Sequence, residues 1–515
     1  MHLPLVDYAV LIAYLTGVVA FGCWFVFRNR TADDFMVAGR SMPGWAVGLS
    51  ILGAYVSSIS LLGLPGKAYA GDWSTYWFTL SLPVSILVAV KYFVPFYRSS
   101  GDVSAYHHLE RRFGAWARTY AVVCFLLTMT ARMGTTLYLL ALALSPMLGW
   151  RIQTIILLTG ALITLYTFLG GSEAVIWTDT VHNVVLIVGV VACVAIQLWG
   201  MPHGPAQTFE IAASQGKFSA GDAGLSLSRP TLWVVLLYGV FINLSNFGID
   251  QNYVQRYITA RDDREAKKSL WVGGMTYVPL SALLLFIGTA LFAYYRVHAD
   301  PNVPADADKV FPYFITHALP SGMTGLVIAA IFAAAMNGFG LNNVATITLC
   351  DLYQRYLRPQ AGEVERMRVL YLSTIGWGVL ATGMAFWMIN ARSALDTWWQ
   401  LAAIFSGGML GLFLLGMLSR RADGTAAAVG VAAGVGVILW MTLSPKWKAL
   451  PPALRSPFDP LLTIVFGTLT ILGVGLAAAA VLRTAPNDPT SAPPRVPPGL
   501  APAAASTPPA ETPGR

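Results

Sequence analysis

The chain has 515 residues, of which 56% are hydrophobic and only 11% are charged. Soluble domains carry about 25% charged residues, so this composition excludes an ordinary soluble protein and indicates one that lies largely in a lipid bilayer. The net charge of +8 does not indicate nucleic-acid binding, because the basic residues lie in short loops between apolar segments.

Apolar segments long enough to cross a bilayer, which takes about 20 residues, recur about thirteen times along the chain. We therefore expect an all-α membrane protein with about thirteen transmembrane helices. Residues 484–515 hold ten of the thirty prolines and should form a disordered tail. The expected spans are 5–27, 44–71, 75–97, 116–148, 152–170, 178–200, 231–258, 270–294, 322–353, 366–391, 394–419, 424–444 and 460–483.

Arginine and lysine concentrate in alternate loops, and such loops face the cytoplasm in membrane proteins. The N-terminus should then lie outside and the C-terminus inside the inner (plasma) membrane. The first segment begins with Asp7 and has no basic stretch before it, so we expect a retained helix and not a cleaved signal peptide. The basic loops are 28–40, 98–118, 256–268, 355–368 and 420–421.

The second span, 44–71, carries glycines, serines and a proline at its middle, and these are poor choices for a helix that faces lipid. A helix broken at mid-membrane leaves backbone groups unpaired, which is tolerated only inside protein or beside a water-filled cavity. Secondary transporters use such breaks to hold solutes and ions. Ser57 and Ser60 should share one helix face, either as solute-binding hydroxyls or as contacts between helices.

Arg132 lies in the middle of the span 116–148, where a charged side chain costs about 2.5–3.5 kcal/mol. It must therefore face a cavity or a partner. One interpretation is a structural ion pair with a carboxylate such as Asp179, or a side chain that extends to the membrane surface. The other is a clamp for an anionic solute, because the planar guanidinium matches a carboxylate with two hydrogen bonds. No acidic residue lies one helical turn away, which favours the clamp.

Asp179 opens or lies just inside the sixth span, 178–200. It could cap the start of that helix, or it could be an oxygen ligand for a sodium ion or part of a proton relay. His182 lies three residues later on the same face and could take part in proton chemistry, or it could simply be satisfied by its neighbours.

The seventh span, 231–258, has a second group of polar and small residues at its middle: Asn243, Ser245, Asn246 and Gly248. Interrupted helices at matching positions of two halves indicate an inverted repeat with a binding site between them. The expected parts of the chain are 1–43 with the first helix and a cytoplasmic loop, 44–200 with spans two to six, 201–419 with spans seven to eleven after an external loop, 420–483 with two further helices, and the tail 484–515.

Several motifs resemble the sodium:solute symporter family. They are AGRSMPGW, AYVSSISLLGLPGKAYAGDW, GGSEAVIWTD and GIDQNYVQRY, the last with a DQ-x-x-x-QR pattern that begins at Asp250 and ends at Arg256. The run ARMGTTLYLLALAL is most similar to the sialic-acid transporter branch and its bacterial relatives. The resemblance covers residues from about 30 to 420 and implies a LeuT-like fold, in which spans two to eleven form two inverted five-helix repeats.

The resemblance also implies a solute site. In the sialic-acid branch, hydroxyls that match Ser57 and Ser60 bind the substrate carboxylate, and an arginine that matches Arg132 pairs with it. A carboxylate-bearing solute is therefore expected near the middle of the membrane, between the second, fourth and seventh spans. The opposite wall of this site would be formed by Asn243, Ser245 and Asn246.

A sodium site implied by the resemblance would use the backbone carbonyls of Gly53 and Val56, with a carbonyl and two hydroxyls from the ninth span. Here the sequence departs from the family. Relatives have a Ser-Thr or Ser-Ser pair after AAAM, whereas this chain has Asn337 and Gly338, or Ala335 and Met336 in the alternative alignment. Asn337 could supply one amide oxygen and Ala334 a carbonyl. An additional sodium site of some relatives would use Asp179, but its ninth-span hydroxyls are missing.

The sequence therefore predicts a secondary active transporter, a sodium-coupled symporter that imports a small organic solute by alternating access. The missing hydroxyls leave open proton coupling through Asp179, or facilitated transport without an ion. A membrane solute sensor derived from a transporter is the alternative from another class. We do not expect an enzyme, because no paired catalytic carboxylates or nucleophile–base set is recognisable. The expected partners are the solute, the coupling ion and lipid, without another cofactor, nucleic acid or obligate protein partner.

Overall fold

The computed structural model describes residues 4–24, 31–336, 339–389, 394–447 and 450–482. Within these ranges the chain is helical and has no β-strand. The long helices are α1 (Leu5–Trp24), α9 (Ala115–Leu148), α10 (Ile152–Trp199), α14 (Asp263–Val297), α16 (Met323–Met336), α18 (Glu363–Met388), α19 (Ala394–Leu418), α20 (Gly424–Leu443) and α21 (Thr463–Val481). The shorter ones are α2 (Ala32–Val37), α3 (Gly44–Tyr55), α4 (Ser58–Ala70), α5 (Tyr76–Leu80), α6 (Leu82–Val88), α7 (Val94–Ser100), α8 (His107–Phe113), α11 (Pro205–Ser214), α12 (Leu232–Gly248), α13 (Gln251–Ile258), α15 (Ala307–His317) and α17 (Leu341–Ile347).

Nine segments of the described chain are long and apolar enough to cross a membrane, and two further crossings are pairs of helices bent at a break. Two shorter apolar helices, Ile152–Leu165 and Ser406–Leu418, lie where the fifth and eleventh spans were expected. The all-α membrane fold is therefore confirmed, and the total of thirteen crossings stays a prediction. The expected tail 484–515 lies outside the described residues.

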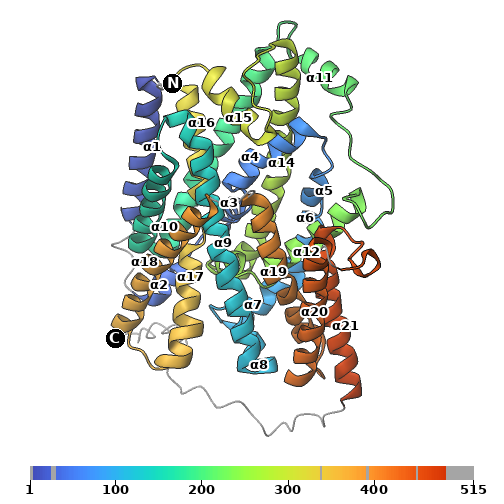
Figure 1. Ribbon diagram of the computed structural model, residues 1–515. Helices are drawn as coiled ribbons and strands as arrows, with labels where there is room; N and C mark the ends of the chain where they lie inside the picture. Colours follow the sequence, from blue (N-terminus) through green and yellow to red (C-terminus); the bar gives the residue numbers. More distant parts are fainter. Residues whose placement is uncertain (1–3, 25–30, 337–338, 390–393, 448–449, 483–515) are drawn as a thin grey trace, which may run out of the picture.

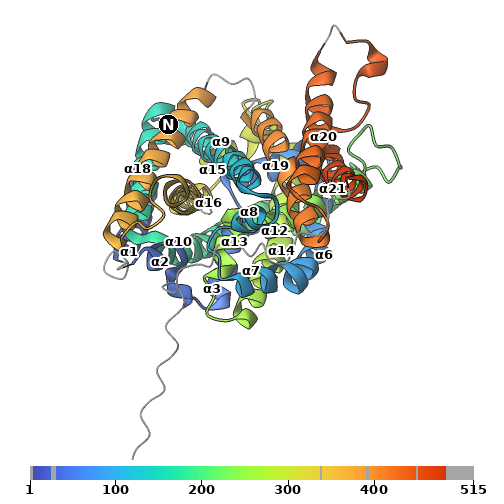
Figure 2. The same ribbon diagram turned by 90° about the horizontal axis from the view of Figure 1, so that it is seen from below.

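The helices form one bundle, and its two ends are distinct (Figure 1). α1 begins at the end that carries α11 and α15, and α21 ends at the opposite end, which also carries α8. The two views agree that α20 and α21 lie side by side at one edge of the bundle, away from α1 and α10 (Figures 1 and 2). The helix α3 lies inside the bundle and packs against α14 and α10.

The second span is bent by 53° between α3 and α4, as its sequence predicted. Val56 and Ser57 have extended backbone angles, so α3 ends at Tyr55 and a new helix begins at Ser58. Behind the break, Gly288 of α14 lies so close to Pro65 that an added Cβ would come within 2.0 Å of the Pro65 carbonyl oxygen. The missing side chain therefore lets α14 support α4 at short range.

The seventh span is bent by 52° between α12 and α13. Its break lies at Ile249 and Asp250, where the Asp250 side chain accepts a hydrogen bond from the Asn252 amide and caps α13. The polar residues from Asn243 to Asn246 lie on the last turns of α12, before the break. The expectation that they mark the break itself was therefore wrong by a few residues.

The helix α10 joins the expected fifth and sixth spans through a kink at Gly171. This glycine has φ +57°, and an added Cβ would lie within about 3 Å of Phe35, so both backbone angle and space exclude a side chain here. The segment after the kink runs from Gly171 to Trp199. Asp179 consequently lies two turns inside this helix, and the interpretation of Asp179 as a cap at the helix start was wrong.

The buried carboxylate of Asp7 joins the first helix, α1, to α16 by hydrogen bonds. Asp7 is only 1% exposed, and its Oδ1 accepts hydrogen bonds of 2.7 Å from the backbone amides of Gly322 and Gly325. These amides belong to the first turn of α16 or precede it, where N–H groups have no partner within the helix and the helix dipole favours negative charge. Asp7 thus caps α16 from another helix.

Candidate solute and cation site

At the break between α3 and α4, carbonyl oxygens with partial negative charge lie near the start of a helix, which carries partial positive charge. Among the described residues, no donor hydrogen-bonds to the carbonyl oxygens of Gly53 or Val56. These oxygens lie at the C-terminal end of α3, where the helix dipole adds partial negative charge, while α4 begins at Ser58 with its partly positive end. The break can therefore hold a cation on one side and an anion on the other.

The two predicted serines occupy different positions at this break. Ser57 precedes α4 at the N-cap position, but its side chain makes no capping hydrogen bond and is largely buried. Ser60 lies in the first turn of α4, where its hydroxyl donates to the Tyr55 carbonyl at 3.1 Å and also hydrogen-bonds with Tyr277. Ser60 therefore bridges the break, whereas the Ser57 hydroxyl is the better placed of the two to bind another group.

Arg132 approaches the same break from α9. Its Nη2 donates a hydrogen bond of 2.5 Å to the carbonyl oxygen of Ala54, in the last turn of α3. The guanidinium is partly exposed and lies close enough to Asp250, at the other break, for electrostatic attraction. Asp179, the carboxylate suggested as its ion-pair partner, pairs with Arg256 instead, and Asp250 is the carboxylate that attracts Arg132.

Asp179 forms a buried ion pair with Arg256 of α13. One oxygen of its carboxylate accepts hydrogen bonds from the Ser50 hydroxyl at 2.6 Å and from Arg256 Nη2 at 3.1 Å. The exposed fractions of the two side chains are only 1% and 4%. His182, on the same helix, shares a hydrogen bond of 2.5 Å with Tyr14 of α1. Whether Asp179 also binds an ion stays a prediction, but any ion there has to compete with a guanidinium.

The polar residues of α12 mainly join helices to each other. The Asn243 amide accepts a hydrogen bond of 2.9 Å from the Tyr55 hydroxyl and donates one of 3.0 Å to Ser81. Asn246 also hydrogen-bonds with the Tyr55 hydroxyl. The carbonyl of Ser245 accepts the amides that follow at the break. These side chains hold α12 against α3, and their predicted contact with a solute remains untested.

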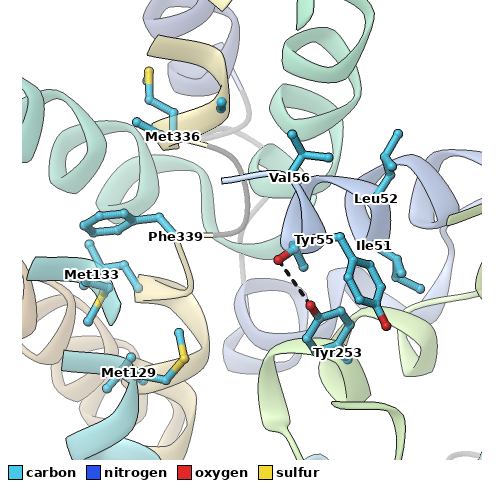
Figure 3. Packing of buried hydrophobic residues seen from close by; sticks show 14 of the residues in the cluster. Ile51, Leu52, Tyr55, Val56, Met129, Met133, Tyr253, Met336 and Phe339 are labelled. Atoms are coloured by element: carbon cyan, nitrogen blue, oxygen red, sulfur yellow. Dashed lines mark hydrogen bonds between the residues drawn. The ribbon is translucent and has the colours of Figure 1, made fainter. Parts of the chain in front are cut away.

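An aromatic cluster around the break was not predicted from the sequence. Tyr55 stacks on Tyr277 at 5.2 Å between ring centroids and contacts Tyr253 at 5.1 Å. The Tyr253 hydroxyl donates to the Ala54 carbonyl at 3.2 Å, and Figure 3 shows a hydrogen bond at Tyr253 as a dashed line. The tyrosines that flank the two breaks in the sequence were the available signal. The Ala54 oxygen thus receives two donors, one of them charged.

The ninth span is described only in part. Asn337 lies outside the described residues, so its predicted role as a sodium ligand stays a prediction. Ala334 is buried near the end of α16. Met336 and Phe339, on either side of positions 337 and 338, lie across from Val56 in Figure 3. The end of α16 is therefore drawn opposite Val56, and an ion site shared by the two segments stays a prediction.

The family model described as "Sodium:solute symporter family" matches residues 35–434. The chain belongs to the sodium:solute symporter family. Among members of this family, it is 33% identical to the sodium/sialic acid symporter NanT of Aliivibrio fischeri, over 84% of this chain and 87% of that protein. It is also 33% identical to the sodium/sialic acid symporter SiaT of Proteus mirabilis, over 84% and 89% of the two chains.

A solved structure of the same family supports the fold. It is the substrate-bound, outward-open state of a Na⁺-coupled sialic acid symporter, with a TM-score of 0.85 and 30% sequence identity, covering 93% of this chain and 98% of that one. The LeuT-like architecture with broken helices is thereby confirmed, as is the expectation of a multi-pass membrane transporter. The relatives in the sodium:solute symporter family are transporters and not enzymes.

Proposed function

We propose that the chain imports a small carboxylate-bearing solute together with sodium, by alternating access in the inner membrane. The observation that carries this proposal is the position of Arg132, whose guanidinium donates a hydrogen bond to Ala54 at the break between α3 and α4. Ser57 and the start of α4 belong to the same break. A guanidinium, a hydroxyl and a helix N-terminus are three groups that favour a carboxylate.

Sialic acids are the solutes that we favour within this class. They carry a carboxylate, and the two relatives named above are sodium/sialic acid symporters that share a third of their residues with this chain. The carboxylate would be bound by Arg132 and Ser57. The rest of the solute would extend toward the wall that carries Asn243 and Asn246.

Sodium is the proposed coupling ion. The carbonyls of Gly53 and Val56, which receive no donor from the described residues, would supply two oxygen ligands, and the segment at the end of α16 would add Ala334 and Asn337. Coupling through a proton on Asp179 is less favoured, because its carboxylate is held in the ion pair with Arg256. The relatives named above are sodium symporters, which supports the same choice. A sensor without transport finds no support among them.

The orientation of the chain in the membrane is part of the proposal. The end of the bundle that carries α8 also carries the basic loop 98–118, and basic loops remain in the cytoplasm. We therefore place the start of α1 outside and the end of α21 inside the cell.

The test is uptake of labelled N-acetylneuraminate into proteoliposomes. The initial rate should rise with external sodium, and replacing sodium by choline should abolish concentrative uptake. Arg132→Ala should reduce uptake strongly and Arg132→Lys less, because lysine keeps the charge but loses the planar fork. Equal rates in choline would contradict sodium coupling. Uptake of the methyl ester at the same rate as the acid would contradict recognition of the carboxylate.

A further inference from the structure

The carbonyl oxygen of Ala54 belongs to the same end of α3 as the carbonyls proposed to bind sodium. In the sequence it stands next to Gly53 and two residues before Val56, whose carbonyls we assign to the sodium ion. It accepts a hydrogen bond from Arg132 at 2.5 Å and one from the Tyr253 hydroxyl at 3.2 Å. The residue proposed to bind the solute carboxylate is therefore bonded to the helix end proposed to bind sodium.

A guanidinium in this position opposes the binding of a cation. Its positive charge repels a sodium ion held by the neighbouring carbonyls, and this repulsion is strong because the site lies within protein and membrane, where screening is weak. The guanidinium also draws electron density toward its own hydrogen bond with the α3 terminus. The Tyr253 hydroxyl is neutral, so it repels a sodium ion less and withdraws less electron density from the end of α3.

Arg132 is held less firmly than Arg256, the buried arginine of this region, although the Asp250 carboxylate attracts it. It forms one hydrogen bond and no salt bridge with the described residues, and its side chain is partly exposed. Arg256 differs in every respect, since it is 4% exposed and bonded to Asp179, Ser50 and Asn252. Moving Arg132 away from Ala54 breaks a single hydrogen bond, and a solute carboxylate offers two in return.

We propose that Arg132 couples the solute and sodium sites by exchanging the Ala54 carbonyl for the solute carboxylate. Without solute, the guanidinium lies on Ala54 and weakens sodium binding. A bound carboxylate draws the guanidinium away, neutralises its charge and allows sodium to bind more tightly. By thermodynamic reciprocity, sodium must favour the solute by the same factor. This inference rests on the proposed function, to which it adds the residue that links the two sites.

The decisive measurement is sodium affinity in the absence of solute. Purified wild type, Arg132→Gln and Tyr253→Phe are titrated with sodium chloride, with choline chloride holding the ionic strength constant, and the rise in melting temperature gives the half-saturating concentration. Arg132→Gln removes the charge but keeps an N–H donor. It should bind sodium at least about five-fold more tightly than wild type, a typical coupling factor. Tyr253→Phe is the matched control, because it removes a donor to the same oxygen without removing a charge, and it should change sodium affinity less.

An unchanged or weaker sodium affinity in Arg132→Gln would overturn the proposal and leave Arg132 as a solute clamp alone. An equal gain in Tyr253→Phe would also overturn it, because the gain would then come from freeing the oxygen and not from removing the charge. If wild type shows no stabilisation by sodium, the proposed sodium coupling fails as well.

A second measurement on wild type remains decisive if Arg132→Gln does not fold. Sodium titrations are repeated with N-acetylneuraminate and with its uncharged methyl ester. The acid should raise sodium affinity about five-fold or more, and the ester should not. Equal effects of acid and ester would overturn the proposal. Failure of the acid to raise sodium affinity, whether it binds without effect or does not bind at all, would also overturn the proposal.

Discussion

The two bent helices turn by nearly the same angle, 53° for α3–α4 and 52° for α12–α13, but their backbone groups are satisfied differently. At the α12–α13 break, the carbonyl of Phe247 accepts a hydrogen bond from the Tyr257 hydroxyl, and that of Gly248 accepts one from Tyr97. The carboxylate of Asp250 caps the helix that follows. We call it the closed break, because tyrosine hydroxyls and a capping carboxylate serve it, although the carbonyls of Asn246 and Ile249 receive no donor from the described residues.

The α3–α4 break is left incomplete. The carbonyls of Gly53 and Val56 receive no donor from the described residues, and the Ser57 side chain caps nothing. Arg132 is the charged group that reaches this break, through one hydrogen bond. A bend alone therefore does not define a binding site in this fold, and the incomplete break is the one expected to exchange its partners with ions and solutes.

The largest expected effect on the free energy of unfolding concerns Arg256, which belongs to α13 at the closed break. Asp179→Asn leaves Arg256 buried without its counter-charge, which should lower the free energy of unfolding by about 3–5 kcal/mol. Arg132→Ala, at the incomplete break, should change stability by less than about 1 kcal/mol, since it loses one hydrogen bond. Unfolding of the solubilised protein by denaturant would compare the two.

The double variant Asp179→Asn with Arg256→Gln serves as the control, because it removes both charges and should recover part of the lost stability. A destabilisation by Arg132→Ala as large as that of Asp179→Asn would break the distinction between the two regions.

A smaller effect should follow removal of a hydroxyl from the closed break. Tyr257→Phe leaves the buried carbonyl of Phe247 without a donor, which should lower the free energy of unfolding by about 1–2 kcal/mol. Solute and sodium affinities should be unchanged within error, because this carbonyl is fully satisfied and takes no part in exchange. Loss of sodium affinity in Tyr257→Phe would show that both breaks contribute to the ion site.

The smallest expected effect on stability is that of Ser57→Ala, which removes a hydroxyl without a capping role. Its melting temperature without ligand should match that of wild type. Solute affinity should fall by about five-fold, equivalent to one hydrogen bond of about 1 kcal/mol. Ser60→Ala is the contrasting variant, because Ser60 bridges the break and its loss should lower stability. A stability loss in Ser57→Ala and none in Ser60→Ala would reverse the roles that the geometry assigns to them.

Much of the fold followed from local sequence. The glycines, serines and proline of residues 44–71 predicted the first break, because whether the backbone continues as a helix depends mainly on the residue types at that position. The second break was placed too early, since the polar residues Asn243 and Asn246 serve contacts with Tyr55 and not the break. Sequence does not distinguish a polar residue that marks a break from one that joins two helices.

The pairing of buried charges could not be predicted in the same way. Asp179 and Arg256 are 77 residues apart and lie on different helices, so neither periodicity nor spacing relates them. Arg132 was expected to face a cavity or a partner, because a charge at mid-membrane has few alternatives, and the structure shows the Ala54 carbonyl as its hydrogen-bond partner. Its attachment to Ala54 depends on the three-dimensional position of the break, which only the structure supplies.

The contact between α1 and α16 has a consequence for biosynthesis. Asp7 finds its partners in the amides of residues made 315 and 318 positions later. At about 5–20 residues per second, the ribosome needs roughly 15–60 s to deliver them. During that interval a carboxylate that ends up buried has nothing to bind in the lipid. We expect α1 to be synthesised early but to pack against α16 late. In nascent chains that end before Gly322, the Asp7 carboxylate should therefore remain hydrated.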